Sequence, residues 1–344
     1  MRKLGIGIIL LLLILGIFIF SKNITFQKEK VKEKPLLKYT FANLKKTKFQ
    51  PHPIALGISL DEKENYISQM FYYTIRDVIG GENKEKKVSG LINIPRKEGT
   101  YPVVIMIRGF VPIETYATGI GTKRAGEVFA ENGFITLAPD FLGYGESDNP
   151  EGGSIEERLQ TYTAVLTLLS SLNNLNSGLT ASYSGKIKAD VSRVGIWGHS
   201  NGGHIAISIL EITGKNYPTV LWAPVSKPFP YSILYFTDDI ADHGKALRKV
   251  VAEFENDYDI ELYSPSNFYS WINASIEIHQ GTADDAVPLK WSDQLVSDLK
   301  KLEKNVTYFT YPGADHNLLP ASPQGGPDWG TAVQRSLDFY KSHL

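Results

Sequence analysis

The sequence of 344 residues contains no cysteine. This absence excludes a disulfide framework, a thiolate metal site and a thiol nucleophile, so nucleophilic chemistry has to come from another side chain. A surplus of charge of one sign is also lacking, because 36 basic residues face 37 acidic ones and the formal net charge is −1. We therefore expect no nucleic-acid partner.

The composition is that of a globular protein, with 42% hydrophobic and 21% charged residues. The length suits one large α/β domain with excursions, or at most two domains. Strands and helices are expected to alternate from Tyr66 onward, and the domain is assigned to residues 66–344. Expected strands are 69–79, 87–94, 103–107, 134–138, 194–197, 219–222, 274–279 and 306–311, and expected helices are 122–132, 155–175, one after Ser200, 289–304 and 329–342. The first two strands form an antiparallel hairpin through a turn at 80–86, and the others form a mostly parallel sheet with helices on both faces.

An uncharged apolar run over residues 4–20 follows Arg2 and Lys3. At about 1.5 Å per helical residue the run covers most of a hydrocarbon core of about 30 Å. The residues that follow form a poor signal-peptide cleavage site. We expect residues 1–21 to be a transmembrane anchor with the catalytic domain outside the cytoplasm, and secretion after signal cleavage is the alternative.

Two further segments are expected outside the sheet. Residues 22–65 are rich in lysine and glutamate at their start and are predicted to be a polar tether, with a short helix near 39–46. Residues 224–271 show no strand pattern but hold several aromatic residues and a helix-like piece at 239–258. Because so many aromatic rings need a surface to cover, this insertion is predicted to be a small cap over the substrate site.

The pattern Gly198-His199-Ser200-Asn201-Gly202 lies between a strand and a helix. This is G-x-S-x-G in the context of a nucleophile elbow, where a sharp turn exposes the serine oxygen above the sheet. The following helix directs its unpaired N–H groups toward the serine, where an anion would be stabilised. Ser200 is the predicted nucleophile.

A serine nucleophile needs a base and an acid that orients the base. His316 follows the last predicted strand and is the predicted base. Asp284 and Asp285 follow the preceding strand; Asp284 is the preferred acid and Asp285 the reserve. The chain order of serine, aspartate and histidine is typical of α/β-hydrolases.

These motifs resemble those of the α/β-hydrolase fold, and within it those of the catalytic domain of prolyl-oligopeptidase-type serine peptidases and related esterases. Residues 279–288, HQGTADDAVP, are similar to the H-G-x-x-D-x-x-V-P stretch of that family, in which the acid is the first aspartate after the glycine turn; this likeness implies Asp284. Such peptidases often carry a β-propeller, for which the stretch before Tyr66 is too short. The resemblance covers residues from about Tyr66 to the C-terminus.

The oxyanion hole is expected to consist of the backbone N–H groups of Asn201 and Phe110. The peptidases of this family commonly use a tyrosine side chain here, but the sequence reads Ile107-Arg108-Gly109-Phe110 and is closer to the H-G-x turn of esterases. Arg108 replaces the histidine, either to recognise a carboxylate or to form a buried ion pair.

Other polar residues are interpreted as structural. His199 and His204 are expected to pack beside the elbow, and Asp140 and Glu146 to tie loops together. A metal at His243 with Asp238, Asp239 and Asp242 is the less favoured alternative to a hydrated cap helix, so no metal and no cofactor is expected.

The predicted function is a serine hydrolase that cleaves an ester or peptide bond through an acyl-enzyme. A prolyl-oligopeptidase-like peptidase acting on short substrates is preferred, and a carboxylesterase of the same fold is the close alternative. A non-catalytic binding module and an acyltransferase are less favoured, and the sequence leaves the oligomeric state open.

Overall fold

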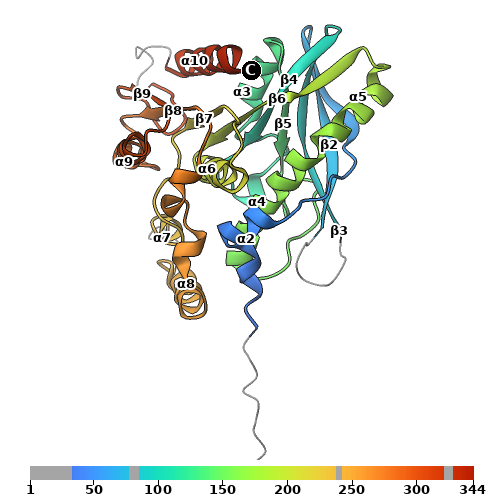
Figure 1. The fold of residues 1–344 in the computed structure, drawn as a ribbon. Helices are drawn as coiled ribbons and strands as arrows, with labels where there is room; N and C mark the ends of the chain where they lie inside the picture. The colour runs from blue at the N-terminus through green and yellow to red at the C-terminus, as the bar shows by residue number, and fades with distance from the viewer. Residues whose placement is uncertain (1–32, 77–84, 238–241, 321–327) are drawn as a thin grey trace, which may run out of the picture. The chain divides into compact units, whose positions relative to one another are not determined.

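A nine-stranded sheet forms the centre of the computed structural model, which describes residues 33–76, 85–237, 242–320 and 328–344 (Figure 1). Its order is β1-β2-β3-β5-β4-β6-β7-β8-β9. The strands are β1 Ala55–Glu62, β2 Tyr66–Arg76, β3 Glu85–Pro95, β4 Gly99–Ile107, β5 Ile135–Pro139, β6 Ile187–His199, β7 Thr219–Trp222, β8 Ile276–Gly281 and β9 Val306–Tyr311. The pairs β1–β2, β2–β3 and β3–β5 are antiparallel. The pairs β5–β4, β4–β6, β6–β7, β7–β8 and β8–β9 are parallel. The predicted mostly parallel sheet is confirmed.

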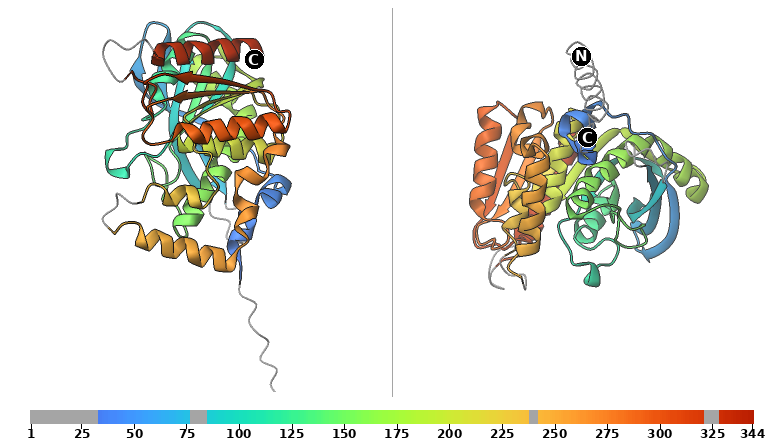
Figure 2. Two further views of the ribbon diagram at one scale, coloured as in Figure 1. Left: turned by 90° about the vertical axis from the view of Figure 1, so that its left-hand side faces the viewer. Right: turned by 90° about the horizontal axis from the view of Figure 1, so that it is seen from below.

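Helices cover both faces of the sheet, and the central strands are therefore buried on both sides. The helices are α2 Phe41–Lys46, α3 Lys123–Glu131, α4 Ser154–Ser171, α5 Leu175–Tyr183, α6 Asn201–Thr213, α7 Tyr231–Leu234, α8 Lys245–Asp257, α9 Leu289–Lys301 and α10 Asp328–His343. Along β4, Val103, Ile105 and Ile107 belong to one apolar core, and Val104 and Met106 belong to the other. The first core includes residues of α4, α5, α6 and α9, and the second includes residues of α3 and α10. Figure 2 accordingly shows α9 and α10 on opposite sides of β8 and β9.

The helix expected at 155–175 corresponds to α4, which ends at Ser171, and the helix α5 that begins at Leu175 was not expected. A 3-10 turn at Leu172–Asn174 separates α4 from α5. Two consecutive asparagines in this turn explain the break, because their side chains compete with the helical backbone hydrogen bonds.

The predicted tether at 22–65 is too long, because residues from Pro35 onward belong to the folded unit. Phe41 is fully buried and stacks on Phe268 at 5.0 Å between ring centroids. The Tyr263 hydroxyl donates a hydrogen bond to the Leu36 carbonyl oxygen at 3.1 Å. Strand β1 was missed because it is an edge strand with mostly exposed side chains, and it therefore lacks the alternation that marks a half-buried strand.

The predicted cap lies between β7 and β8 and contains α7, α8 and three short 3-10 helices. Within its described residues, which omit 238–241, it contains no strand. Its helix begins at Lys245, later than the expected 239, and the predicted hairpin turn at 80–86 lies largely outside the described residues.

The predicted transmembrane anchor at 1–21 also lies outside the described residues. In the part of the chain that the structure describes, no helix combines the length and the apolar character needed to cross a membrane.

Glu211 is a buried carboxyl in the last turn of α6. It is fully inaccessible to solvent, and neither carboxyl oxygen has a hydrogen-bond partner among the described residues. Burial without a compensating partner disfavours the charged form, so it raises the pKa of Glu211 well above its usual value of 4.5. The carboxyl is therefore neutral in the folded protein at moderately acidic pH.

Replacing Glu211 with glutamine is expected to remove a pH-dependent cost to stability. Since folding raises this pKa, the contribution of Glu211 to the free energy of unfolding is most favourable below its unfolded pKa. This contribution is lost as the pH rises toward the folded pKa, by at most about 1.4 kcal/mol per pH unit. Thermal unfolding from about pH 5 to about pH 8 should show the melting temperature of Glu211→Gln rising relative to wild type. A pH-independent difference would contradict the burial of an ionisable carboxyl here.

Candidate active site

Ser200 occupies a strained turn between β6 and α6. Its φ of 58° and ψ of −122° are rare for a residue with a side chain. Two backbone hydrogen bonds hold it there: the Ser200 N–H donates to the Trp222 carbonyl at 2.9 Å, and the Val225 N–H donates to the Ser200 carbonyl at 3.0 Å. Both the N–H and the carbonyl of Ser200 are thus hydrogen-bonded to the chain at the end of β7 or shortly after it.

Glycines allow the loop after β4 to lie directly against this turn. A Cβ atom on Gly109 would lie 2.8 Å from the Ser200 Cβ and 3.3 Å from its Oγ. A Cβ atom on Gly202 would overlap the Ile107 carbonyl. Any larger residue at either position would push the loop away from Ser200.

This approach brings two backbone N–H groups beside the serine. Asn201 is the first residue of α6, so its N–H has no intrahelical acceptor. The Phe110 N–H has no hydrogen-bond acceptor among the described residues. Asn201 and Phe110 line the same cavity, so the two residues predicted for the oxyanion hole are brought together.

Arg108 is buried, and it forms no ion pair with any described residue, so the buried ion pair expected as one of its two roles is wrong. Its guanidinium donates to the carbonyl oxygens of Gly109 and Asp140, each at 2.9 Å. The group lies over the rings of Tyr144 and Tyr116, at 4.0 and 4.6 Å from the centroids. These contacts fix the carbonyl of Gly109 and thereby the loop that carries Phe110.

Asp140 and Glu146 tie loops together, as expected. The Asp140 carboxylate accepts hydrogen bonds from Ser89 at 2.6 Å, Tyr116 at 2.6 Å and Thr118 at 2.8 Å. Its burial nevertheless raises its pKa, because these bonds compensate only part of the desolvation. Glu146 accepts a bond from the Tyr72 hydroxyl at 2.8 Å.

His316 lies in the loop after β9, with Nδ1 at 2.9 and 3.1 Å from the two carboxylate oxygens of Asp284. The Asp284 side chain is inaccessible to solvent, whereas Asp285 is exposed. The backbone N–H groups of Ala286 and Val287 and the side-chain amide of Gln280 also donate to Asp284. Burial opposes its ionisation, but the hydrogen bond and charge of His316, with the other donors, outweigh it and lower the pKa of Asp284.

His199 links the nucleophile turn to the His316 loop. Its Nε2 lies 3.0 Å from the His316 carbonyl oxygen, so this nitrogen carries the proton, and the two rings are 4.7 Å apart. Burial and the neighbouring His316 lower the pKa of His199 to about 4, which keeps it neutral. The sequence predicts only a packing role for His199. Its position next to Ser200 at the end of the strand was the feature that could have indicated a role in the site.

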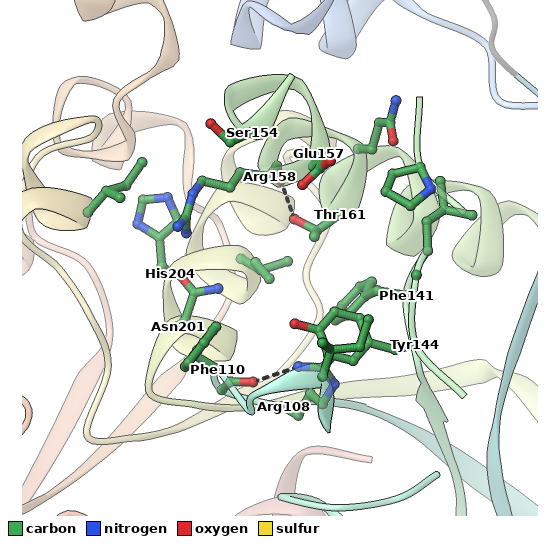
Figure 3. Close-up of a pocket in the computed structure, with 18 of the residues that line it drawn as sticks. Arg108, Phe110, Phe141, Tyr144, Ser154, Glu157, Arg158, Thr161, Asn201 and His204 are labelled. Atoms are coloured by element: carbon green, nitrogen blue, oxygen red, sulfur yellow. Dashed lines mark hydrogen bonds between the residues drawn. The ribbon is translucent and has the colours of Figure 1, made fainter. Parts of the chain in front are cut away.

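A cavity of about 520 Å³ lies next to Asn201 and Phe110 (Figure 3). Its walls come from the β4 and β5 loops, α4, α6 and the cap, which contributes Phe229, Ser232 and Ile233. His204, whose Nε2 is 2.8 Å from the Tyr162 hydroxyl, is part of the wall, and burial lowers its pKa to about 4. His316 and Asp284 do not line the cavity, so it lies on one side of the serine only.

Two family models match parts of the chain. Residues 177–344 match the Prolyl oligopeptidase family, and residues 73–218 match Chlorophyllase. A Synechocystis sp. protein whose name proposes that it is a carboxymethylenebutenolidase is 23% identical over 243 residues, which cover 69% of this chain and 83% of that protein.

Solved structures agree with the sheet topology. The acetyl xylan esterase from Paenibacillus sp. R4 aligns with a TM-score of 0.59 and 17% identity over 90% of this chain and 94% of that chain. The chain has the α/β-hydrolase fold. The dipeptidyl peptidase 4 of Porphyromonas gingivalis aligns with a TM-score of 0.50 and 16% identity over 86% of this chain, which spans only 36% of that peptidase. The two family matches and the Synechocystis relative support a serine hydrolase of the peptidase or esterase type.

The structure describes only part of the cap cluster considered as an alternative metal site. Among the residues that the structure describes, no group of three or more histidine or acidic residues is arranged to hold a metal ion. Asp238 and Asp239 lie outside those residues, so the weighed cluster with His243 is only partly described.

Replacing Asp284 with asparagine should lower the turnover of the hydrolase by several orders of magnitude, about 10⁴-fold if other serine triads are a guide, because His316 would lose the partner of its Nδ1. The matched control is Asp285→Asn, which changes an exposed neighbour and should alter kcat/KM little. Steady-state kinetics on a short-chain ester measure both. Equal losses in the two variants, or a loss only at Asp285, would contradict the assignment of the acid.

Proposed function

We propose that this protein is a carboxylic ester hydrolase in which Ser200, His316 and Asp284 act as a catalytic triad. The observation that supports this most is the strained Ser200 turn packed against Gly109, with the His316–Asp284 pair linked to the same turn through His199. Each member of the predicted triad thus comes from the loop after a different strand, at one edge of the sheet.

In this proposal the Ser200 Oγ attacks the carbonyl carbon of the ester as His316 Nε2 accepts its proton. Asp284, which contacts Nδ1, keeps Nε2 free to accept that proton and stabilises the imidazolium. The N–H groups of Asn201 and Phe110 stabilise the negative oxygen of the tetrahedral intermediate.

The intermediate collapses by breaking the bond to the alkoxy group, which leaves as an alcohol with the proton from His316. An acyl group remains on Ser200. Water then attacks the acyl carbon while His316 accepts a proton from it, and the carboxylic acid leaves as His316 passes that proton to the Ser200 Oγ.

An ester is preferred over a peptide for two reasons. The oxyanion loop presents backbone N–H groups and contains no tyrosine between Ile107 and Phe110, as in the esterase type of turn. The Paenibacillus esterase also aligns over 94% of its length, whereas the Porphyromonas peptidase aligns over 36% of its own.

A serine-type peptidase is the second candidate. The match of residues 177–344 to the Prolyl oligopeptidase family favours it, since this part includes Ser200, Asp284 and His316. The two candidates share every step up to the acyl-enzyme and differ in the leaving group.

A fluorophosphonate probe should label the wild-type protein and leave Ser200→Ala unlabelled, because the probe reacts with activated serines. The wild type should hydrolyse p-nitrophenyl acetate and butyrate while leaving alanyl and prolyl p-nitroanilides nearly untouched. Anilide turnover with a kcat/KM at or above that for the esters would favour the peptidase. An intact, folded protein that is neither labelled nor active would favour a binding module.

We further propose that residues 1–21 anchor the enzyme in a membrane with the catalytic domain outside the cytoplasm. The support is the sequence itself, which places Arg2 and Lys3 ahead of an uncharged run from 4 to 20.

Cell fractionation tests the anchor. The full chain should remain with membranes after a carbonate wash, and deletion of residues 1–21 should release an active enzyme into the soluble fraction. Recovery of the full, unprocessed chain in the soluble fraction would contradict the proposal, whereas a mature N-terminus beyond the apolar run would indicate cleavage and secretion.

A further inference from the structure

Arg158 lies on the face of α4 that lines the cavity beside the oxyanion loop. Tyr162 follows it by four residues and therefore lies on the same face of the helix. The Arg158 side chain extends toward His204, which lies one turn after Asn201 on α6 (Figure 3). Arg158 thus faces α6, the helix that begins directly after Ser200.

No described residue accepts a hydrogen bond from the guanidinium of Arg158 or forms an ion pair with it, although Glu157 and Glu114 also line the cavity. The side chain is exposed to the cavity, and the surrounding protein lowers the pKa of Arg158 by desolvation. An arginine still stays protonated at neutral pH, so the cavity contains a cation that lies near Glu157 but is hydrogen-bonded to no described residue.

The other arginine of the cavity, Arg108, uses both of its terminal nitrogens within the protein. It donates to two carbonyl oxygens and lies over two tyrosine rings. Its Nε has no acceptor among the described residues but is fully buried, whereas no described residue accepts a hydrogen bond from any part of the Arg158 guanidinium. The planar group of Arg158 suits a carboxylate, which it can bind through two parallel hydrogen bonds.

The position of the cavity indicates which part of a substrate would meet Arg158. The leaving alcohol takes its proton from His316, and neither His316 nor Asp284 lines the cavity. The cavity does reach Asn201 and Phe110, which would hold the oxygen of the acyl carbonyl. The acyl chain therefore extends into this cavity, between apolar walls that include Phe141, Leu142, Ile205, Phe229 and Ile233.

We propose that Arg158 determines specificity by binding a carboxylate at the far end of the acyl chain, so that the preferred substrates are monoesters of short dicarboxylic acids. This inference rests on the proposed ester hydrolase function. Arg158 binds substrate and takes no part in proton transfer.

The test compares monoethyl succinate, glutarate and adipate with the corresponding neutral half-amide ethyl esters, which match them in shape. Ethanol release gives kcat/KM for wild type, Arg158→Gln, Arg158→Lys and the control Arg96→Gln, which alters an exposed arginine outside the cavity that is paired with Glu62. Circular dichroism and thermal unfolding establish that each variant is folded.

Wild type and Arg96→Gln should prefer the acid over the half-amide by at least about 10-fold for one chain length, as expected for a charged hydrogen-bonded pair. Arg158→Gln should lose this preference through a higher KM for the acid, so that its kcat/KM values for the acid and the half-amide become similar, and Arg158→Lys should retain part of the preference.

Wild type that hydrolyses the half-amides without preferring any acid would overturn the role of Arg158 and leave the esterase intact, as would a preference that survives in Arg158→Gln. Failure of wild type to hydrolyse any of these esters, together with no fluorophosphonate labelling of Ser200, would overturn the proposed function and this inference with it.

Discussion

The strained backbone of Ser200 is the constraint on which the rest of the site depends. Such a conformation costs about 1–3 kcal/mol and persists only where surrounding contacts over-determine it. Here the contacts are two backbone hydrogen bonds to the chain at and after β7, and the close approach of the β4 loop that Gly109 and Gly202 permit. Because backbone atoms do this work, the serine and the N–H groups beside it are positioned together by the sheet.

The base and acid are positioned differently, by buried polar side chains. Asp284 accepts hydrogen bonds from two backbone N–H groups and from Gln280 in addition to His316. The other three donors therefore hold its carboxylate in place independently of His316. His199 then holds the His316 loop through its carbonyl oxygen, next to the serine. The two halves of the site meet through a neutral histidine whose burial suppresses its charge.

The cap and α4 divide the surroundings of the serine into two unequal sides. One side is the cavity, which is open to solvent, and the other is the loop that carries His316. Two arginines in the cavity wall illustrate how far environment determines role. Arg108 donates from both terminal nitrogens to carbonyl oxygens, lies over ring faces and supports a loop, whereas Arg158 has no such partner among the described residues, as expected for a group that meets its partner only in a substrate.

Much of the fold and the main site residues could be predicted from the sequence, because they depend on short stretches: buried strands such as β4 and β7, and the glycine-flanked Ser200. The inclusion of residues 35–65, the break after α4 and the links made by His199 and Gln280 could not. Burial and pairing depend on residues far apart in the chain, as when Phe41 packs on Phe268 or His199 reaches His316. The same reason hid Arg158, since only the tertiary structure shows which arginine its neighbours satisfy and which they leave to a ligand.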